Sequence, residues 1–256
     1  MPPELRFTTT ASACNYLPAE QNQMSYRLCR EIDPGRYEAM LTRGWRRFGN
    51  QFFRPTCPSC ARCRSIRVDV AGFAPTKSQR RTLKLNHDVR VEIRPPSVTP
   101  RHVELYNSYH AFMALEKGWP FHPISEEDYA QQFIGSGFPF AREFLYFLDS
   151  ELVAVGLVDV VTTLSSSLYF FHHPAHRSRS LGVFSLLEEL AHARAHGIQY
   201  HHLGYWIPEC DSMRYKSNYK PFELLVGYPL DHEQPQWVPE TDWIPVLNTE
   251  PIEMIL

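Results

Sequence analysis

The chain has 256 residues, of which 43% are hydrophobic and 21% are charged, with 26 Lys and Arg against 28 Asp and Glu. This much apolar material can form a core, which excludes a largely disordered chain. No run of about 18 uncharged apolar residues occurs, and the first residues lack a basic-then-apolar signal, so we expect a cytoplasmic protein with no membrane span.

Residues 1–100 are expected to form the smaller of two regions, basic and rich in cysteine. Its first 30 residues are typical of a loop. The Asp33-Pro34 pair predicts a helix start, and Gly49-Asn50 can form a hairpin turn. The elements expected in chain order are a helix over 31–43, a hairpin over 44–54 and a strand over 65–70.

Residues 101–256 are expected to form a larger region with an acidic tail. The predicted elements are a helix over 101–115, strands over 144–148, 152–161 and 166–171, a helix over 180–196 and a strand over 198–206. Ser180 can cap the second helix, and Gly197 can end it. Its expected buried face consists of Val183, Phe184, Leu187, Leu190 and Ala191. Antiparallel strands followed by a helix and a further strand predict an α+β fold.

Positive charge is concentrated between Arg43 and Arg101, where 14 Lys and Arg stand against 3 Asp and Glu. From Asp231 to the end there are six acids and no Lys or Arg. Clustered cations favour polyanions because phosphates release counterions on binding, so the basic segment is a candidate nucleic-acid surface. The alternative is a solvated face that acidic side chains balance across the fold.

Three of the six cysteines lie in the pattern Cys57-x2-Cys60-x2-Cys63. This spacing lets thiolates converge on one centre, as zinc knuckles and iron–sulfur loops require. Cys14 is the natural fourth donor for zinc or an iron–sulfur cluster, and nearby arginines are expected to lower the pKa of the thiols. The alternative is a loop of ordinary reduced cysteines.

Several motifs resemble one known family. In the first half they are Cys14-Asn-Tyr-Leu-Pro, Arg43-Gly-Trp-Arg-Arg-Phe-Gly49, the Cys57 to Cys63 repeat and Ser78-Gln-Arg-Arg81. In the second half they are Ser180-Leu-Gly182, His202-Leu-Gly-Tyr-Trp206, Met213-x-Tyr215-Lys216 and Lys220-Pro-Phe-Glu223. Across nearly the whole chain the sequence thus resembles the arginyl-tRNA–protein transferase family.

The resemblance implies a second half similar to the GCN5-related acetyltransferase (GNAT) fold. It also implies transfer of an amino acid from aminoacyl-tRNA to the N-terminal amine of a protein that begins with Asp or Glu, with no cofactor required. The short chain resembles the bacterial branch of the family, which transfers leucine and so marks proteins for degradation by the N-end rule. Residues 177–182 depart from the usual acetyltransferase pyrophosphate loop, which argues against acetyl-CoA.

The implied reaction is attack of an α-amine on an activated ester, which requires positioning, deprotonation and stabilisation of an oxyanion. Lys216 can bind the terminal phosphate or polarise the ester, while Tyr215 can donate a proton or stack on adenine. Glu223 can accept the amine proton or orient Lys216. Asp159 lies in an apolar strand, where a buried carboxylate needs a task or a partner. Each of the four could instead be a surface or packing residue.

Two groups of basic residues are candidates for binding the substrates. Arginine binds carboxylates bidentately, so the candidates for an acidic N-terminal side chain are Arg43, Arg46, Arg47 and Arg54. The candidates for tRNA phosphates are Arg80 and Arg81 in an expected loop, Arg177, Arg179 and the helix start at Ser180.

Three alternatives remain open. An arginyl donor would need a carboxylate-lined pocket, whereas an apolar pocket around Trp206 would favour leucine. An acetyltransferase that uses coenzyme A is disfavoured by residues 177–182. A zinc-knuckle RNA-binding module without catalysis would explain the basic segment and the cysteines, but it would leave Tyr215, Lys216 and Glu223 without a role.

Overall fold

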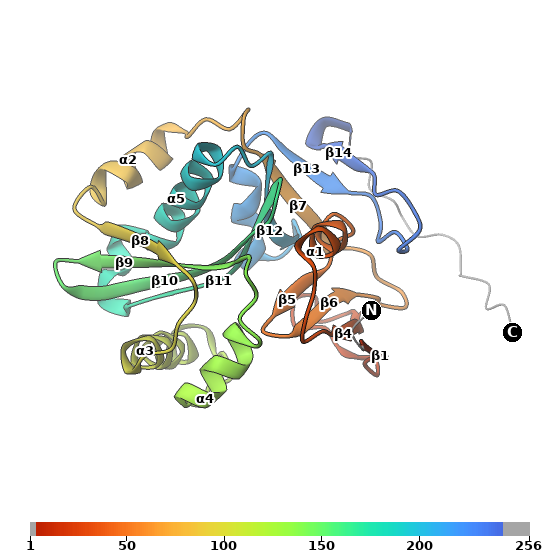
Figure 1. The fold of residues 1–256 in the computed structure, drawn as a ribbon, viewed down its shortest axis with the longest axis horizontal. Helices are drawn as coiled ribbons and strands as arrows, with labels where there is room; N and C mark the ends of the chain where they lie inside the picture. The colour runs from red at the N-terminus through yellow and green to blue at the C-terminus, as the bar shows by residue number, and fades with distance from the viewer. Residues whose placement is uncertain (1–3, 243–256) are drawn as a thin grey trace, which may run out of the picture.

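The computed structural model describes residues 4–242, and it confirms the predicted α+β class (Figure 1). Its centre is a mixed eight-stranded sheet with strand order β14-β13-β7-β12-β11-β10-β9-β8. In chain order these strands are β7 (Arg64–Asp69), β8 (Arg90–Arg94), β9 (Ala141–Leu148), β10 (Glu151–Val160), β11 (Leu164–His172), β12 (Tyr200–Trp206), β13 (Phe222–Leu225) and β14 (Trp237–Pro239). The strands predicted over 65–70, 144–148, 152–161, 166–171 and 198–206 are all present.

A second sheet, with order β1-β4-β6-β5, lies beside the first. Its strands are β1 (Leu5–Thr8), β4 (Met24–Leu28), β5 (Arg46–Phe48) and β6 (Gln51–Pro55), and a short pair joins β2 (Ser12–Ala13) to β3 (Gln21–Asn22). The predicted hairpin is therefore confirmed as β5–β6. The expectation of a loop over the first 30 residues is wrong, because β4 pairs with β6 and β1 pairs with β4.

The helices lie on both faces of the large sheet: α2 and α5 on one side, α3 and α4 on the other (Figure 1). Their bounds are α1 (Pro34–Leu41), α2 (Lys77–Leu85), α3 (Pro100–Lys117), α4 (Glu126–Tyr129) with a π-helical turn η1 (Ala130–Ile134), α5 (Leu181–Ala195) and α6 (Asp211–Arg214). Three 3-10 segments are η2 (Pro174–Arg179), η3 (Tyr215–Asn218) and η4 (Glu240–Asp242). The predicted helices correspond to α1, α3 and α5. Among the described helices, none is long and apolar enough to cross a membrane.

Helix α5 is buried differently from the prediction. Ala191 is exposed, whereas Ser185, Glu189 and Ala193 are buried. Ser180 occupies the N-cap position, but its side chain makes no capping hydrogen bond, and its φ of 55° is left-handed. Its carbonyl oxygen accepts hydrogen bonds from the amides of Val183 and Phe184. The expected hydroxyl cap is therefore wrong, although the helix begins where the sequence predicts.

The two predicted regions share the large sheet. Strands β7 and β8 come from the first hundred residues. In the large sheet β7 lies between β12 and β13, and β8 forms the edge beside β9. The division at residue 100 therefore does not separate two independent sheets.

Asp159 and Arg47 form a buried ion pair between the two sheets. Asp159 is 0% exposed, and its Oδ2 accepts hydrogen bonds from Arg47 Nε and from the Tyr37 hydroxyl, each at 2.7 Å. The other Arg47 nitrogens bind Asp159 Oδ1 and the Gly49 carbonyl. The two opposite charges compensate each other, so neither is left unpaired in the protein interior. We therefore assign Asp159 and Arg47 to packing, in place of the catalytic and substrate-binding roles expected from the sequence.

Breaking this pair should be costly. Asp159→Asn should lower the free energy of unfolding by about 3–5 kcal/mol, because it leaves the Arg47 guanidinium buried without a counter-charge. Urea denaturation measures the loss. The control is Asp88→Asn, which removes an exposed partner of Arg179 and should change stability little. Equal losses in the two variants would show that the buried pair contributes no more to the free energy of unfolding than the exposed pair does.

Candidate active site

The parallel strands β11 and β12 separate shortly after they pair. Only Leu164–Ser166 of β11 and Tyr200–His202 of β12 are in register, although both strands continue beyond. At the same place the register between β12 and β7 shifts, between His202 and Gly204. Gly204 has a φ of 89°, which side chains with a Cβ rarely adopt. The strands therefore diverge and leave room between them for side chains from other elements.

Arg46 of β5 occupies this split between β11 and β12. Its guanidinium donates hydrogen bonds to Ser166 Oγ and to the Ser167 carbonyl oxygen, and the side chain is buried. A Cβ at Gly204 would lie 3.4 Å from Arg46 Nη2. Arg46 therefore closes the side of the split that faces the smaller sheet, while keeping a positive charge inside it.

Lys216 approaches the same split from η3. Its Nζ donates a hydrogen bond of 2.5 Å to the carbonyl oxygen of Tyr205, and the side chain is half-buried. Burial and then the positive charge of Arg46 lower the pKa of Lys216 to about 7. A substantial fraction of the amine is then neutral at physiological pH, so Lys216 can accept a proton.

Ser167, His201 and Glu189 form a polar network at the base of the split. Ser167 Oγ contacts His201 Nε2 at 2.9 Å and donates to Glu189 Oε2, which itself lies 3.1 Å from His201 Nε2. Ser165 Oγ contacts the other ring nitrogen at 2.8 Å. In a nucleophile triad the carboxylate holds Nδ1 and an accessible serine holds Nε2. Here the carboxylate is on Nε2 together with Ser167, and Ser165, on Nδ1, is only 2% exposed. This network therefore serves to hold β11, β12 and α5 together.

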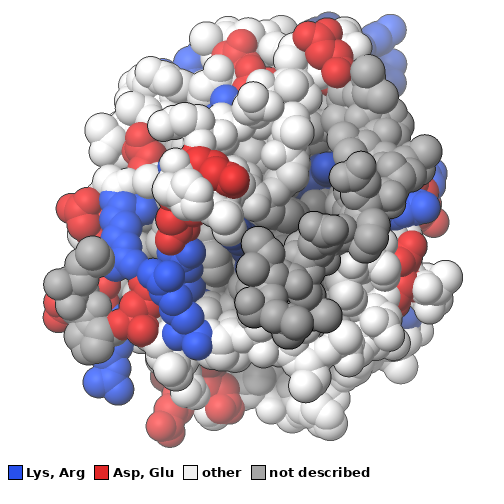
Figure 2. Space-filling model, turned by 90° about the vertical axis from the view of Figure 1, so that its right-hand side faces the viewer, with Lys and Arg blue, Asp and Glu red and all other residues white. Residues whose placement is uncertain are grey.

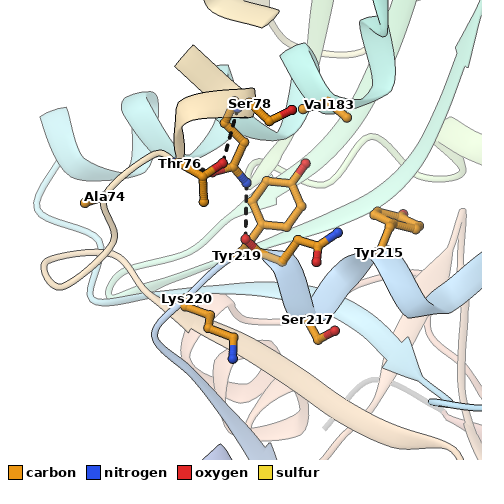
Figure 3. Close-up of a pocket in the computed structure, with 10 residues that line it drawn as sticks. Ala74, Thr76, Ser78, Val183, Tyr215, Ser217, Tyr219 and Lys220 are labelled. Atoms are coloured by element: carbon orange, nitrogen blue, oxygen red, sulfur yellow. Dashed lines mark hydrogen bonds between the residues drawn. The ribbon is translucent and has the colours of Figure 1, made fainter. Parts of the chain in front are cut away.

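A cavity of about 480 Å³ opens between α2, the start of α5 and η3 (Figure 3). Tyr215, Ser217 and Lys220 line one wall, and Thr76 and Val183 lie opposite. Tyr215 is 45% exposed. The described residues that line the cavity include no Asp or Glu. Tyr215 and Lys216 therefore point to different places: the tyrosine to the open cavity, and the lysine to the split.

Glu223 lies away from Lys216 and has a partner of its own. Its Oε2 accepts hydrogen bonds from Arg67 Nη2 at 2.6 Å and from Nε at 2.9 Å. The Arg67 guanidinium carbon lies 3.7 Å from the ring centre of Tyr200 and 4.1 Å from that of Trp237. We therefore assign Glu223 to the packing of β13 against β7, in place of the expected role as proton acceptor.

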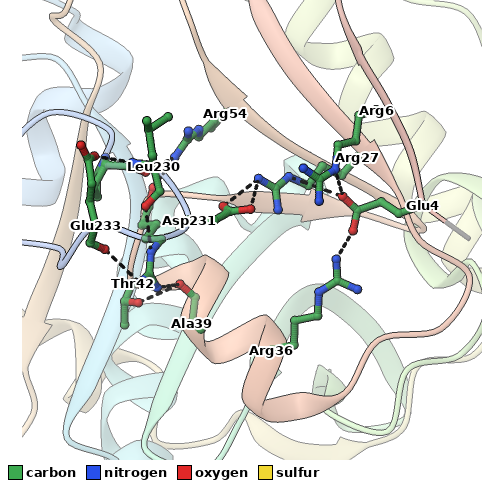
Figure 4. Close-up of polar contacts among 12 residues, drawn as sticks. Glu4, Arg6, Arg27, Arg36, Ala39, Thr42, Arg54, Leu230, Asp231 and Glu233 are labelled. Carbon is green, nitrogen blue, oxygen red and sulfur yellow. Dashed lines mark hydrogen bonds and ion pairs between the residues drawn. The ribbon is translucent and has the colours of Figure 1, made fainter. Parts of the chain in front are cut away.

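Arg43 and Arg54 bind backbone carbonyls of the loop after β13. Arg54 Nη1 donates to Pro229 O at 2.8 Å, and Arg43 donates to Glu233 O at 3.0 Å and to Leu230 O at 3.3 Å. Figure 4 shows Arg54 together with Leu230, Asp231 and Glu233 of this loop. Of the four arginines expected to bind an acidic N-terminal side chain, Arg46 lies in the split, Arg43 and Arg54 bind the loop after β13, and Arg47 is enclosed.

The predicted tRNA-binding residues lie on two neighbouring elements. Arg80 and Arg81 are on α2, a helix where a loop was expected, and Arg177 and Arg179 are on η2. Asn86, at the end of α2, donates a hydrogen bond of 2.8 Å to the Arg179 carbonyl, so the two elements adjoin. Arg179 pairs with Asp88 and Arg177 with Glu116, both at the surface.

The basic segment does not form one positive surface. Arg62, Arg67 and Arg94 each pair with an acid from a distant part of the chain: Glu209, Glu223 and Glu143. On the face in Figure 2, Lys and Arg form a short band with Asp and Glu beside it. The alternative stated for the sequence, acids that balance the basic segment across the fold, therefore describes these arginines.

The four cysteines predicted to bind a metal do not converge as ligands. Among the described residues, a set with three ligand atoms within 4.8 Å of one another is Glu151, His173 and His176, and no such set includes the cysteines. Burial and then the neighbouring thiols raise the pKa of Cys63 to about 12, opposite to the expected lowering by arginines. The metal site therefore stays a prediction of the sequence, and we derive no step through it.

No motif or spacing in the sequence groups Ser167, Glu189 and His201 as a set. They come from β11, α5 and β12, and only the crossover between the two strands brings them together. The one signal in the sequence was Glu189 itself, a charged residue next to Leu190 on the side of α5 that is buried.

Loss of the Glu189 charge should destabilise the split. Glu189→Gln should lower the free energy of unfolding by about 1.5–3 kcal/mol, because the carboxylate accepts hydrogen bonds from Ser167 and Ser185 in a buried setting. Urea denaturation checks this, with Glu188→Gln, one residue away, as the control. If Glu188→Gln were equally harmful, the network would not be what stabilises this region.

Known protein families match both halves of this chain in sequence. Two family models match the chain: "Arginine-tRNA-protein transferase, N terminus" over residues 12–81 and "Arginine-tRNA-protein transferase, C terminus" over residues 101–226. Solved structures with partial similarity include FemX, with a TM-score of 0.43 and 11% identity over 78% of this chain and 79% of that one. Another is a GCN5-related glucosamine N-acetyltransferase region of a fungal protein, with a TM-score of 0.38 and 7% identity over 77% of this chain and 22% of that one.

Curated relatives match over most of their length. A protein named aspartate/glutamate leucyltransferase from Helicobacter hepaticus is 36% identical over 91% of this chain and 97% of its own. Proteins of the same name are 34% identical in Campylobacter jejuni, over 88% of this chain and 94% of theirs, and in Pseudomonas paraeruginosa, over 86% and 93%. With both halves of the family matched in order, this chain belongs to the arginine-tRNA-protein transferase family.

Proposed function

We propose that this protein transfers leucine from leucyl-tRNA to the N-terminal α-amine of proteins that begin with Asp or Glu. The names of its relatives support the reaction class and both substrates. The observation that carries the proposal is the position of Lys216, whose amine donates to the Tyr205 carbonyl at the split, where burial and the charge of Arg46 lower its pKa to about 7. Because aminoacyl-tRNA is its donor, the proposal places the protein in the cytoplasm.

The chemistry needs one proton acceptor and no covalent intermediate. An N-terminal α-amine has a pKa of about 8, so a base with a pKa near 7 removes its proton at little cost. The amine nitrogen then attacks the ester carbonyl, the carbon–nitrogen bond forms, and the ester carbon–oxygen bond breaks. Lys216 takes the amine proton, and a proton returns to the ribose oxygen that leaves. The Arg46 guanidinium supplies positive charge where the oxyanion develops.

The cavity beside Tyr215 supports leucine over arginine as the transferred residue. A cationic arginine side chain needs a carboxylate partner, whereas the described lining holds uncharged side chains and Lys220. The apolar pocket expected around Trp206 is not the reason, because Trp206 is buried and packs against Phe222. We propose that the tRNA end enters over α2 and η2, with Arg80, Arg81, Arg177 and Arg179 toward the phosphates and the Tyr215 ring beside the terminal adenosine.

The donor and acceptor are tested together. Purified protein is incubated with labelled leucyl-tRNA or arginyl-tRNA and with peptides that begin with Asp, Glu or Ala. We expect label from leucyl-tRNA in the Asp and Glu peptides only. Label from arginyl-tRNA alone would assign the arginyl alternative, and label in no peptide would contradict the proposed function. Coenzyme A should not shift the melting temperature.

Lys216 is tested by a variant that keeps its charge. Lys216→Arg should lower kcat by about 100-fold or more, because a guanidinium stays protonated and cannot accept the amine proton. In the wild type kcat should rise with pH through about 7, as Lys216 loses its proton. Lys117→Arg, at the end of α3, is the control. A Lys216→Arg enzyme with normal kcat and the same pH profile would remove Lys216 from the reaction.

A metal on the cysteines also stays a prediction of the sequence. Elemental analysis of protein purified without air measures zinc, iron and sulfide directly. A stoichiometric metal lost in a Cys57→Ser, Cys60→Ser variant would show that the thiols rearrange to bind it, and metal-free, active protein would show that transfer does not need it.

A further inference from the structure

Two buried donors beside the smaller sheet have no acceptor in the part of the chain that the structure describes. Trp45 is 2% exposed and Arg54 is 8% exposed. Neither Trp45 Nε1 nor Arg54 Nε has a hydrogen-bond partner among the described residues. The guanidinium carbon of Arg54 lies 4.8 Å from the centre of the Trp45 ring, so the two donors belong to one place. A buried donor without a partner costs free energy, and here two of them lie at one place, where one external acceptor could serve both.

A second cation lies over the same ring. The guanidinium carbon of Arg27 is 4.2 Å from the Trp45 ring centre, and Arg27 is itself buried. Burial and then the charge of Arg27 lower the pKa of Arg54. Two like charges around one indole favour an anion between or beside them. The orphan donors and the cations therefore call for the same kind of group, an anion with acceptor oxygens.

Carboxylates of the chain itself already reach this cluster (Figure 4). Asp231 accepts hydrogen bonds from Arg27 Nη2 at 2.8 and 2.9 Å, yet its side chain is half exposed. The loop that carries it follows Tyr228, whose hydroxyl donates to Cys63 O at 2.6 Å, and over residues 229–233 Arg54 and Arg43 bind only its backbone carbonyls. Glu4 lies on the other side of Arg27, its Oε1 3.7 Å from Arg27 Nε, and it also pairs with Arg36.

One residue connects the cluster to the split between β11 and β12. The carbonyl oxygen of Tyr205 accepts the hydrogen bond from Lys216, while its hydroxyl donates to Gly44 O and to Phe53 O, each at 3.1 Å. Gly44 and Phe53 directly precede Trp45 and Arg54 in the chain. Tyr205 thus contacts Lys216 through its backbone carbonyl, and through its hydroxyl it contacts the residues that precede Trp45 and Arg54.

We propose that Trp45, Arg54 and Arg27 form the subsite that binds the side-chain carboxylate of the acceptor's first residue. Asp231 holds this place in the free protein and leaves with its loop when the acceptor binds. The inference rests on the proposed function, which supplies an acceptor with an acidic first residue and an amine that must reach Lys216. Trp45 and Arg27 join Arg54 as specificity-determining residues, and a guanidinium with an indole N–H suits the two oxygens of a carboxylate.

The first test removes the indole N–H of Trp45 and keeps an aromatic side chain at this position. In Trp45→Phe, kcat/KM for a short peptide beginning with Asp should fall about tenfold, mainly through KM, because one hydrogen bond to a charged group is lost. The preference for this peptide over its Asn-initiated match should fall by the same factor. The KM for leucyl-tRNA should stay unchanged.

The matched control is Trp237→Phe, whose indole N–H donates to Thr42 O at 3.1 Å. It should lower the melting temperature and leave the preference for Asp over Asn unchanged. An unchanged preference in Trp45→Phe would overturn the proposal. So would a higher KM for leucyl-tRNA in that variant, which would assign the cluster to the RNA.

The second test removes the resident carboxylate. Asp231→Asn should lower KM for the Asp peptide severalfold, because the acceptor no longer displaces a charged competitor, and Glu233→Gln in the same loop should not. A higher or unchanged KM in Asp231→Asn would contradict the proposed occupancy.

The two proposals can fail separately. If the wild type transfers to no peptide, the proposed function fails, and calorimetry with the Asp peptide alone still tests the subsite. Binding weakened by Trp45→Phe would then support it, and no binding to the wild type would overturn it.

Discussion

The parting of β11 and β12 is the constraint on which the rest of this structure depends. Two parallel strands that stay paired would leave no space between them, but here only three residues of each are in register. The left-handed Gly204 and the shifted register against β7 turn β12 away, and Arg46 fills part of the resulting space. Lys216 then lies half-buried next to a buried cation, which lowers its pKa to about 7. The proton acceptor that we propose is therefore a consequence of sheet geometry.

Arginine in the first half of the chain is used mainly inside the protein. Arg47 neutralises Asp159 in the core, Arg67 lies between two aromatic rings, and Arg46 supports the split. A guanidinium suits these places because it forms several hydrogen bonds in a fixed plane and stacks on rings. The local excess of basic residues in the sequence thus has an architectural cause in part, and the charges that we propose for substrates are Arg46, the arginines around Trp45 and the surface arginines of α2 and η2.

Local signals predicted much of the fold. Asp33 caps α1 as expected, and Gly49-Asn50 turns the β5–β6 hairpin, because both signals depend on neighbouring residues only. Long-range pairing decided the failures: β1 and β4 exist because they pair with β6, and Asp159 is buried because Arg47 meets it from another sheet. For the site, the motifs indicated Tyr215 and Lys216, but no spacing could show that Trp45 and Arg54 share a place without an acceptor.

The central claim is that the Lys216 amine titrates near neutrality in the split. The chain has five lysines, so an NMR titration of protein labelled at lysine ¹³Cε can resolve each one, with Lys216→Arg assigning the signal. The account predicts a midpoint of about 7 for Lys216. A midpoint near the ordinary lysine value of about 10.4 would show that the amine is solvated and charged, and the account would be wrong.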